Sequence, residues 1–173
     1  MRNIKLILVA LSMLPASALA LEAPFFPRLV AHNLEKQRVV LPRDFAGDVN
    51  VIVVSFKRRQ AGDVETWTPW LHRIEAQKRN VRWYSLPTTS RTAGRIADWI
   101  VGRGSTEPDR RRRTIPLHVD KERFGYFLGL PDDAEEDIHI LVVTRRAAIL
   151  ARVSGRFTPE KAAVIEQALI PRK

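Results

Sequence analysis

Three polar residues between an apolar run and a helix-like stretch are the first candidates for chemistry. Arg58, Arg59 and Gln60 lie just after a β-branched run that ends at Phe56, and Gly62-Asp63 then begins a helical pattern. Side chains at the carboxyl end of a central strand, beside helix N-terminal amides, are placed to bind an anion. The alternative is a solvated loop without a ligand, because no glycine-rich phosphate-binding pattern accompanies these residues.

Two tryptophans follow at helical spacing. Trp67 continues the apolar stripe Val64, Leu71 and Ile74, so we predict that it belongs to the core. Trp70 flanks that stripe, which predicts a half-exposed side chain able to anchor a client peptide. Packing at the edge of the domain, against Phe25 or Phe26, is the competing interpretation of Trp70.

A run of four arginines is the strongest local charge in the chain, and it consists of Arg110, Arg111, Arg112 and Arg113. We expect it to lie in a polar loop that spans residues 102–113. There it either neutralises phosphates on an anionic membrane surface or is simply solvated. The acidic turn between Asp132 and Asp137 is a further candidate partner for these arginines, within one molecule or between two.

The chain lacks the residues that many kinds of catalysis need. There is no cysteine among the 173 residues, which excludes disulfides, thiol nucleophiles and thiolate metal sites. The four histidines (His32, His72, His118 and His139) are scattered without helical metal-site spacing, so we predict no metal and no cofactor. There is no nucleophile-elbow motif either, and we therefore expect no catalytic residues.

Strand and helix patterns alternate along the chain. The order is β-α-β-α-β-α-β-β-α, which predicts an α/β fold with a central mixed sheet. The predicted strands are residues 49–56, 81–86, 114–119, 138–144 and 147–154; the predicted helices are residues 64–79, 90–102, 121–128 and 158–169. Parallel strands joined by helices, closed by a hairpin and a last helix, resemble a thioredoxin-like three-layer sandwich.

The spacing around Phe56 also resembles thioredoxins. In that family, four residues separate such a Phe from Cys-Gly-Pro-Cys, and four more precede a helix-kinking proline. Here the two cysteine positions are Ala61 and Val64, and the proline is Pro69. The cis-proline that thioredoxins place before the hairpin has no counterpart near residues 136–138. The resemblance therefore implies the architecture without the redox chemistry.

A second resemblance rests on short motifs. Ser55-Phe56, Gln60, Val64 and Trp67, together with the stretch from Arg113 to Glu160, resemble the mitochondrial assembly factors for the ATP synthase membrane sector and their bacterial relatives. The turn at residues 144–147 departs from that family's usual Asp-x-x-Gly. The resemblance implies an assembly or chaperone-like role, without identifying the client.

The N-terminus predicts export. Arg2 and Lys5 precede an apolar stretch, and Ala18-Leu19-Ala20 fits a signal peptidase site. We predict a signal peptide over residues 1–20, an extended N-terminal arm over 21–40 and a thioredoxin-like domain over 41–173. A retained membrane anchor is the alternative. Cleavage removes two of the basic residues and lowers the net charge from +10 to +8.

The sequence thus favours an exported, periplasmic or secreted, non-redox binding or assembly module with a protein client, and a membrane-associated protein is one candidate for that client. A protein that binds anionic membrane surfaces or polyanions is the second hypothesis, because the chain is strongly basic. A divergent thioredoxin-fold enzyme without thiol chemistry is the third. Export makes nucleic acid an unexpected partner, and the oligomeric state stays open.

Overall fold

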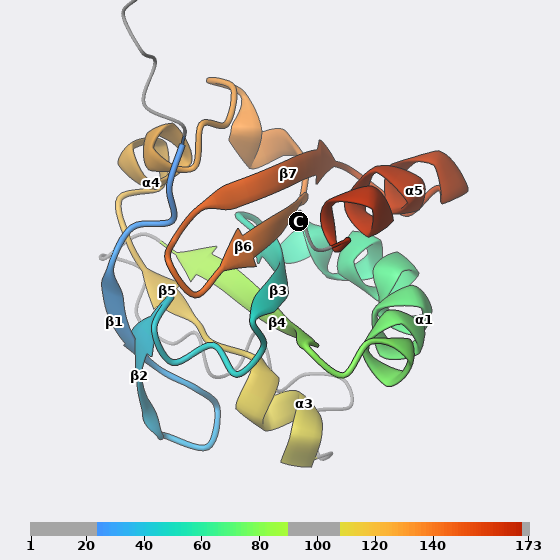
Figure 1. Ribbon diagram of the computed structural model, residues 1–173. Coiled ribbons are helices and arrows are strands. Elements are labelled where there is room, and N and C mark those ends of the chain that lie inside the picture. Colours follow the sequence, from blue (N-terminus) through green and yellow to red (C-terminus); the bar gives the residue numbers. More distant parts are fainter. Residues whose placement is uncertain (1–23, 90–107, 171–173) are drawn as a thin grey trace, which may run out of the picture.

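A five-stranded mixed sheet forms the centre of the computed structural model, which describes residues 24–89 and 108–170 (Figure 1). The strand order is β5-β4-β3-β6-β7. The strands are β3 (Val49–Ser55), β4 (Val81–Thr89), β5 (Leu117–His118), β6 (His139–Thr144) and β7 (Ile149–Ser154). The predicted signal peptide and the predicted helix that begins near Ser90 lie outside the described residues.

The direction of the strands confirms the mixed sheet. β3 pairs in parallel with β4 and antiparallel with β6, and β6 and β7 form the expected hairpin. The central strand β3 is buried along almost its whole length, as its β-branched run predicts for a strand covered on both faces. The third predicted strand is shorter than expected, because only β5 and an isolated bridge at Thr114 pair with β4.

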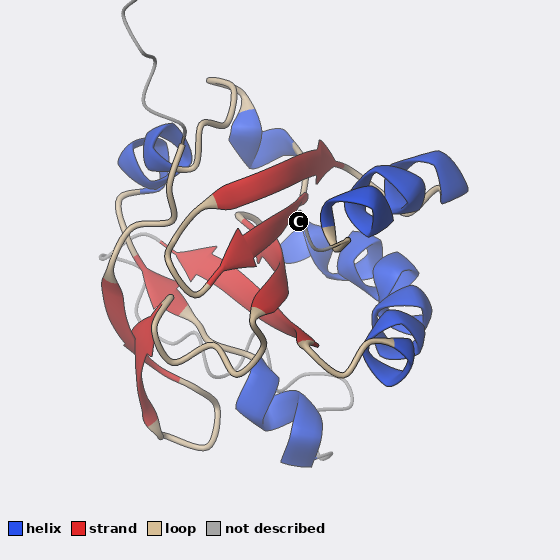
Figure 2. Cartoon of the chain, viewed as in Figure 1, coloured by secondary structure: helices blue, strands red, loops and turns tan. Residues whose placement is uncertain are grey.

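Two helices, α1 (Ala61–Gln77) and α5 (Pro159–Ala168), cover one face of the sheet (Figures 1 and 2). As predicted, Pro69 lies inside α1. Thr158 caps α5 by accepting a hydrogen bond from the backbone N–H of Lys161. The core on this face contains Trp67, whose indole donates to the carbonyl oxygen of Gly155 at 3.0 Å. The prediction that Trp67 is a core residue is confirmed.

Trp70 is also a core residue, so the predicted half-exposed position is wrong. Its side chain is 3% exposed, and its indole N–H donates to Glu166 of α5 at 2.9 Å. The ring lies edge-on to Trp67 at 5.6 Å instead of packing on the N-terminal arm. The stripe on α1 is wider than its spacing suggests, because α5 covers the flank of α1 as well as the sheet.

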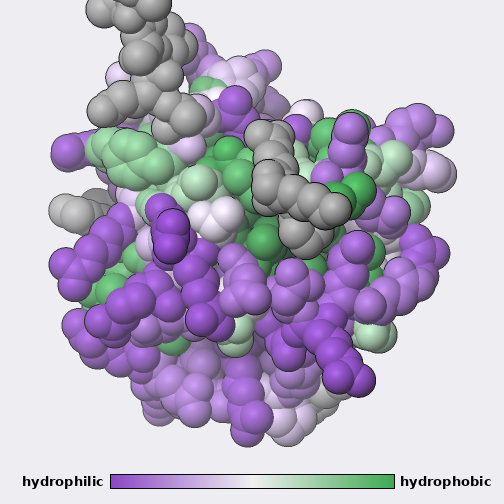
Figure 3. Space-filling view, viewed as in Figure 1, coloured by the Kyte–Doolittle hydropathy of each residue, from purple (hydrophilic) through white to green (hydrophobic). Residues whose placement is uncertain are grey.

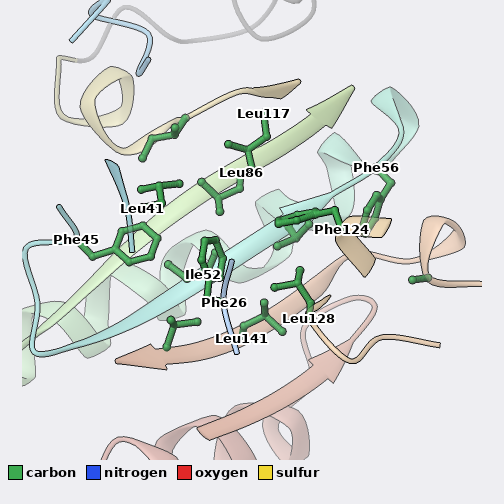
Figure 4. Packing of buried hydrophobic residues seen from close by; sticks show 14 residues of the cluster. Phe26, Leu41, Phe45, Ile52, Phe56, Leu86, Leu117, Phe124, Leu128 and Leu141 are labelled. Atoms are coloured by element: carbon green, nitrogen blue, oxygen red, sulfur yellow. The ribbon is translucent and has the colours of Figure 1, made fainter. Parts of the chain in front are cut away.

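The other face carries α4 (Lys121–Phe127) and the N-terminal segment. Within the predicted arm, β1 (Leu29–His32) and β2 (Arg38–Leu41) form an antiparallel ribbon. Phe26 is 1% exposed and contacts Phe45 and Phe124 edge-on, at 5.7 and 6.1 Å between ring centroids (Figure 4). The N-terminal segment is thus built into the core on this face.

The arginine run forms a short helix, α3 (Pro108–Arg113), and the predicted loop is wrong over these residues. Arginine has a good intrinsic helix propensity. Asp109 and Arg113 form an ion pair four residues apart, at 2.7 Å, which supports one helical turn. Contacts with other elements, described below, hold the helix in place.

Two single-turn 3-10 helices complete the described chain. The first, η1 (Arg58–Gln60), connects β3 to α1, and the second, η2 (Ala134–Glu136), precedes β6. α4 ends before Gly129, whose φ of +63° favours glycine, in agreement with the predicted helix over residues 121–128. No helix in the described ranges is long and apolar enough to cross a membrane.

Candidate functional site

Gln60 is a structural link within the predicted binding loop. It is 1% exposed. Its side-chain oxygen accepts from the backbone N–H groups of Phe56 and Lys57, at 2.7 and 2.9 Å, and its amide donates to the carbonyl oxygen of Glu135 at 2.9 Å. The Gln60 side chain therefore joins η1 to η2, and its burial leaves little of it accessible to a ligand, while its predicted role in ligand contact stays a prediction.

Glu136 closes the same loop from the outside. Its carboxylate pairs with both Lys57 and Arg59, so the segment after β3 is tied to the segment before β6. The neighbouring Lys57 ammonium, and then Arg59, hold the pKa of Glu136 below its usual value. Arg58 is exposed on this loop. The cations predicted to bind an anion are thus partly engaged by a carboxylate of the chain itself.

The positions of the thioredoxin cysteines have ordinary roles at the start of α1. Ala61 is exposed, and Val64 is half-buried against the core beneath α1 and α5. The residues that precede β6, Asp137-Ile138, contain no proline. With no cysteine in the chain, the groups that thiol–disulfide exchange needs are missing.

His139 lies behind this loop. Its ring is 3% exposed, and Nε2 donates to the carbonyl oxygen of Ala134 at 2.8 Å. The ring also contacts Phe56 edge-on, at 6.0 Å between centroids. Burial lowers the pKa of His139 below its ordinary value and so favours the neutral form of the ring that holds η2 against the sheet.

An open cleft of about 800 Å³ lies beside the loop, at the same edge of the sheet. One wall is the N-terminal segment and the other is α4. Its apolar lining consists of Phe25, Pro27, Leu29, Val119, Phe124 and Phe127. Because β3, β4 and β5 are parallel, Val119 and Asp120 follow β5 at the carboxyl edge, where open α/β sheets usually bind ligands.

The polar lining of the cleft balances both signs of charge: Arg28, Lys121 and Arg123 oppose Asp120, Glu122 and Glu135. Lys121 joins the cleft to the closed loop, since its ammonium donates to the carbonyl oxygen of Phe56 at 2.7 Å and lies 3.3 Å from Glu135. The arrangement suits an apolar group flanked by charges of both signs.

Aromatic side chains at the cleft extend onto the surface. Phe25 is 45% exposed and lies 6.2 Å from Phe127, while the neighbouring Tyr126 is 80% exposed. The Arg123 guanidinium lies over the Phe127 ring at 5.6 Å. Figure 3 shows hydrophobic residues gathered over α4, at the upper left. Exposed aromatic groups of this kind are common anchors in protein interfaces.

Each of the four arginines of α3 contacts a partner on a neighbouring element. Arg110 pairs with Glu65, and Arg112 with Glu35 at 3.0 Å. Arg111 donates to the carbonyl oxygen of Leu34 at 2.7 Å. Arg113 pairs with Glu75 at 2.7 Å and stacks over Trp83. Within the chain, the carboxylate partners of these arginines thus come from α1 and the N-terminal ribbon instead of the acidic turn at residues 132–137, and the alternative of pairing between two molecules stays a prediction.

Sequence reasoning missed the cleft residues Arg28, Lys121, Arg123 and Phe127. The available signal was Phe25-Phe26, a pair of aromatic residues without an obvious place in the predicted core. The structure divides this pair, because Phe26 enters the core and Phe25 lines the cleft. In such a short irregular segment, the sequence alone does not show which of two adjacent aromatic residues is buried and which is exposed.

Comparison with known proteins finds structures of similar fold but no matching sequence family. No family model matches the chain, and no curated protein matches it in sequence. Similar solved structures include BsSco, a member of the Sco family of cytochrome c oxidase assembly proteins. It is 12% identical with a TM-score of 0.61, over 86% of this chain and 93% of that one.

Two others are thioredoxin proteins. The thioredoxin domain of a thiol-disulfide oxidoreductase from Bacteroides vulgatus is 17% identical, with a TM-score of 0.56 over 86% of this chain and 98% of that one. The exposed lipoprotein thioredoxin of Streptococcus pneumoniae is 9% identical, with a TM-score of 0.53 over 83% and 98%. The fold of this protein is therefore thioredoxin-like, as predicted.

Proposed function

We propose that this protein is an exported, non-redox binding module that holds a protein client in the cleft between the N-terminal segment and α4. The observation that carries the proposal is the open aromatic cleft beside a loop that internal bonds close. In this proposal the client contacts Phe25 and Phe127 instead of Gln60 and Trp70. Without thiols, binding is the function that this edge of the sheet supports best.

An assembly role is part of the proposal. The sequence resembles ATP synthase assembly factors, and a protein of similar fold belongs to a family of cytochrome c oxidase assembly proteins. These likenesses concern short motifs and a fold, so the client itself has to be identified by capture. A membrane-associated protein with an apolar side chain between charged residues fits the lining of the cleft.

Export of the protein is part of the same proposal. The predicted cleavage after Ala20 leaves three residues, 21–23, before Pro24. Pro24 is the first described residue, and it packs against Gly129. N-terminal sequencing of the protein from its native envelope checks this step. A mature chain that starts at Leu21 is expected, and a blocked or uncleaved N-terminus would support the membrane-anchor alternative.

Photo-crosslinking tests the cleft. A photoreactive phenylalanine analogue replaces Phe127 in one variant and Val164, an exposed residue of α5, in the control. We expect a discrete crosslinked partner from position 127 alone. The same partner must be lost when Phe25→Asp is added and kept when Glu160→Gln is added. Identical products from positions 127 and 164, or no product at 127, would contradict the proposal.

A further inference from the structure

A second surface lies at the opposite edge of the sheet, where the parallel strands begin. Val49, the first residue of β3, pairs with Val81 at the start of β4 and with Thr144 at the end of β6. Residues 42–48, 78–80 and 145–148 are therefore neighbouring segments at one edge. Hydrogen bonds between them confirm the arrangement, since the backbone N–H of Asp48 donates to the carbonyl oxygen of Asn80 at 2.9 Å.

This edge is rich in basic side chains, which we call the basic edge. It consists of Arg43, Lys78, Arg79, Arg82, Arg145 and Arg146, with Asp44, Asp48 and Glu75 as the acidic residues. Arg43 pairs with Asp44 at 2.9 Å, and Glu75 is already engaged by Arg113. Within residues 24–89 and 108–170, Lys78, Arg79, Arg145 and Arg146 have no carboxylate within ion-pair distance.

Hydrogen bonds fix two of the basic side chains at this edge, Arg145 and Arg82. Arg145 donates to the carbonyl oxygens of Gly47 and Ala46, at 3.1 and 2.6 Å. A Cβ at Gly47 would lie 2.8 Å from the backbone nitrogen of Arg82, so Gly47 lets the two basic segments approach closely. Arg82 in turn donates to the carbonyl oxygen of Arg79 at 3.1 Å. The charges thus cluster because the backbone of three loops packs together.

We propose that the basic edge docks on an anionic phospholipid surface. Guanidinium groups bind phosphate oxygens in a bidentate manner, and several of them on one face match a surface of many phosphates. The large apolar side chains that are exposed in the described chain all lie outside these three segments. A specific protein interface normally needs such anchors at its centre, whereas an electrostatic contact with lipid headgroups does not.

Docking in this way orients the molecule. The basic edge lies at the amino ends of the parallel strands, and the cleft lies at their carboxyl ends. A chain bound to the membrane through the basic edge therefore presents its cleft to the aqueous side. In Figure 1 the loop before β3 and the loop before β4 lie in the lower half of the view, and Figure 3 shows this part of the surface as hydrophilic.

Vesicle sedimentation tests the proposal with the purified protein carrying its native N-terminus. Vesicles of phosphatidylglycerol and phosphatidylcholine are compared with vesicles of phosphatidylcholine alone, at low and at physiological salt. The test variant is Arg79→Gln with Arg146→Gln. The control is Arg58→Gln with Arg156→Gln, which removes the same charge at the carboxyl edge.

We expect binding only to the anionic vesicles, with a steep loss as salt rises. Each basic residue near an anionic surface contributes about fivefold to binding, so the test variant should bind about 25-fold more weakly. The control should change by less than about threefold. If the melting temperature of the test variant falls, Lys78→Gln with Arg146→Gln replaces it.

Three results would overturn the assignment. An equal loss of binding in both variants would show that net charge alone acts, without a defined face. Equal binding to neutral and anionic vesicles would point to the N-terminus or to apolar contacts. Binding to polyglutamate but not to vesicles would assign the basic edge to an acidic protein.

Discussion

At the scale of single residues, Trp70 shows that a flanking position on a helical stripe does not fix exposure. A second helix covers the flank of α1, and the indole finds a carboxylate partner there. A buried tryptophan with its N–H satisfied contributes more to stability than to binding.

Trp70→Ala should therefore destabilise the fold. Removal of the ring leaves a cavity against Trp67 and an unpartnered Glu166, so we expect a loss of about 3–5 kcal/mol in the free energy of unfolding. Urea unfolding measures it. Trp70→Phe keeps most of the packing and should lose less. If the Trp70→Ala chain kept its stability, Trp70 would not contribute to the core.

His139 should make stability depend on pH. Because burial lowers its pKa in the folded chain, the unfolded chain, with a pKa of about 6.5, binds the proton first as the pH falls. Its contribution to stability is complete above that value and is lost below it, by at most about 1.4 kcal/mol per pH unit.

Urea unfolding at about pH 7.5 and about pH 5.5 checks this expectation. His139→Phe keeps a ring against Phe56 but cannot be protonated, so its stability should fall less between the two conditions. The charged groups nearest to His139, Asp133, Asp137 and Arg152, are the same in both chains. Equal losses in the two proteins would exclude His139 as the source.

At the scale of elements, the turn from β3 to α1 is held by hydrogen bonds to neighbouring elements. Gln60 bonds to the end of β3 and to η2, and Lys121 of α4 donates to the carbonyl oxygen of Phe56. The segment that carries the active site in thioredoxins is here a junction between three elements. The cleft lies on the other side of Lys121, between the N-terminal segment and α4.

Gln60→Ala should loosen this junction. It leaves the buried N–H of Phe56 without its acceptor and frees η2, which predicts a loss of about 2–4 kcal/mol in unfolding free energy. The matched control is Arg58→Ala, an exposed neighbour that should change stability by less than about 0.5 kcal/mol. Hydrogen exchange at Phe56 and Lys57 locates the effect. Equal exchange in both variants would contradict it.

At the scale of the whole molecule, the N-terminal segment belongs to the packed core. Phe26 lies between Phe45 and Phe124, and its backbone N–H donates to the carbonyl oxygen of Ala147 at 2.8 Å (Figure 4). The division between the predicted arm and the predicted domain therefore crosses a continuous set of contacts.

A chain that starts at Leu29 should consequently be much less stable than one that starts at Leu21. The loss of Phe26 alone predicts about 3–5 kcal/mol. Thermal unfolding followed by circular dichroism compares the two chains, with Phe25→Ala in the longer chain as the control for the exposed ring. If both chains melt at the same temperature, the segment only lies on the surface.

Much of the fold follows from the sequence because it depends on local patterns. The β-branched run predicts β3, and the Thr158-Pro159 pair predicts the start of α5. The missing cysteines exclude thiol chemistry without any coordinates. These features depend on residue type and on spacing of a few positions, which the sequence states directly.

The candidate sites depended on tertiary structure. Whether Gln60 is exposed or Arg113 is paired depends on residues dozens of positions away, such as Glu135 and Glu75. The cleft and the basic edge each combine segments that only the sheet register brings together. Periodicity along one element determines which face is apolar, but the partners that cover that face or leave it open are decided by the packing of the whole chain.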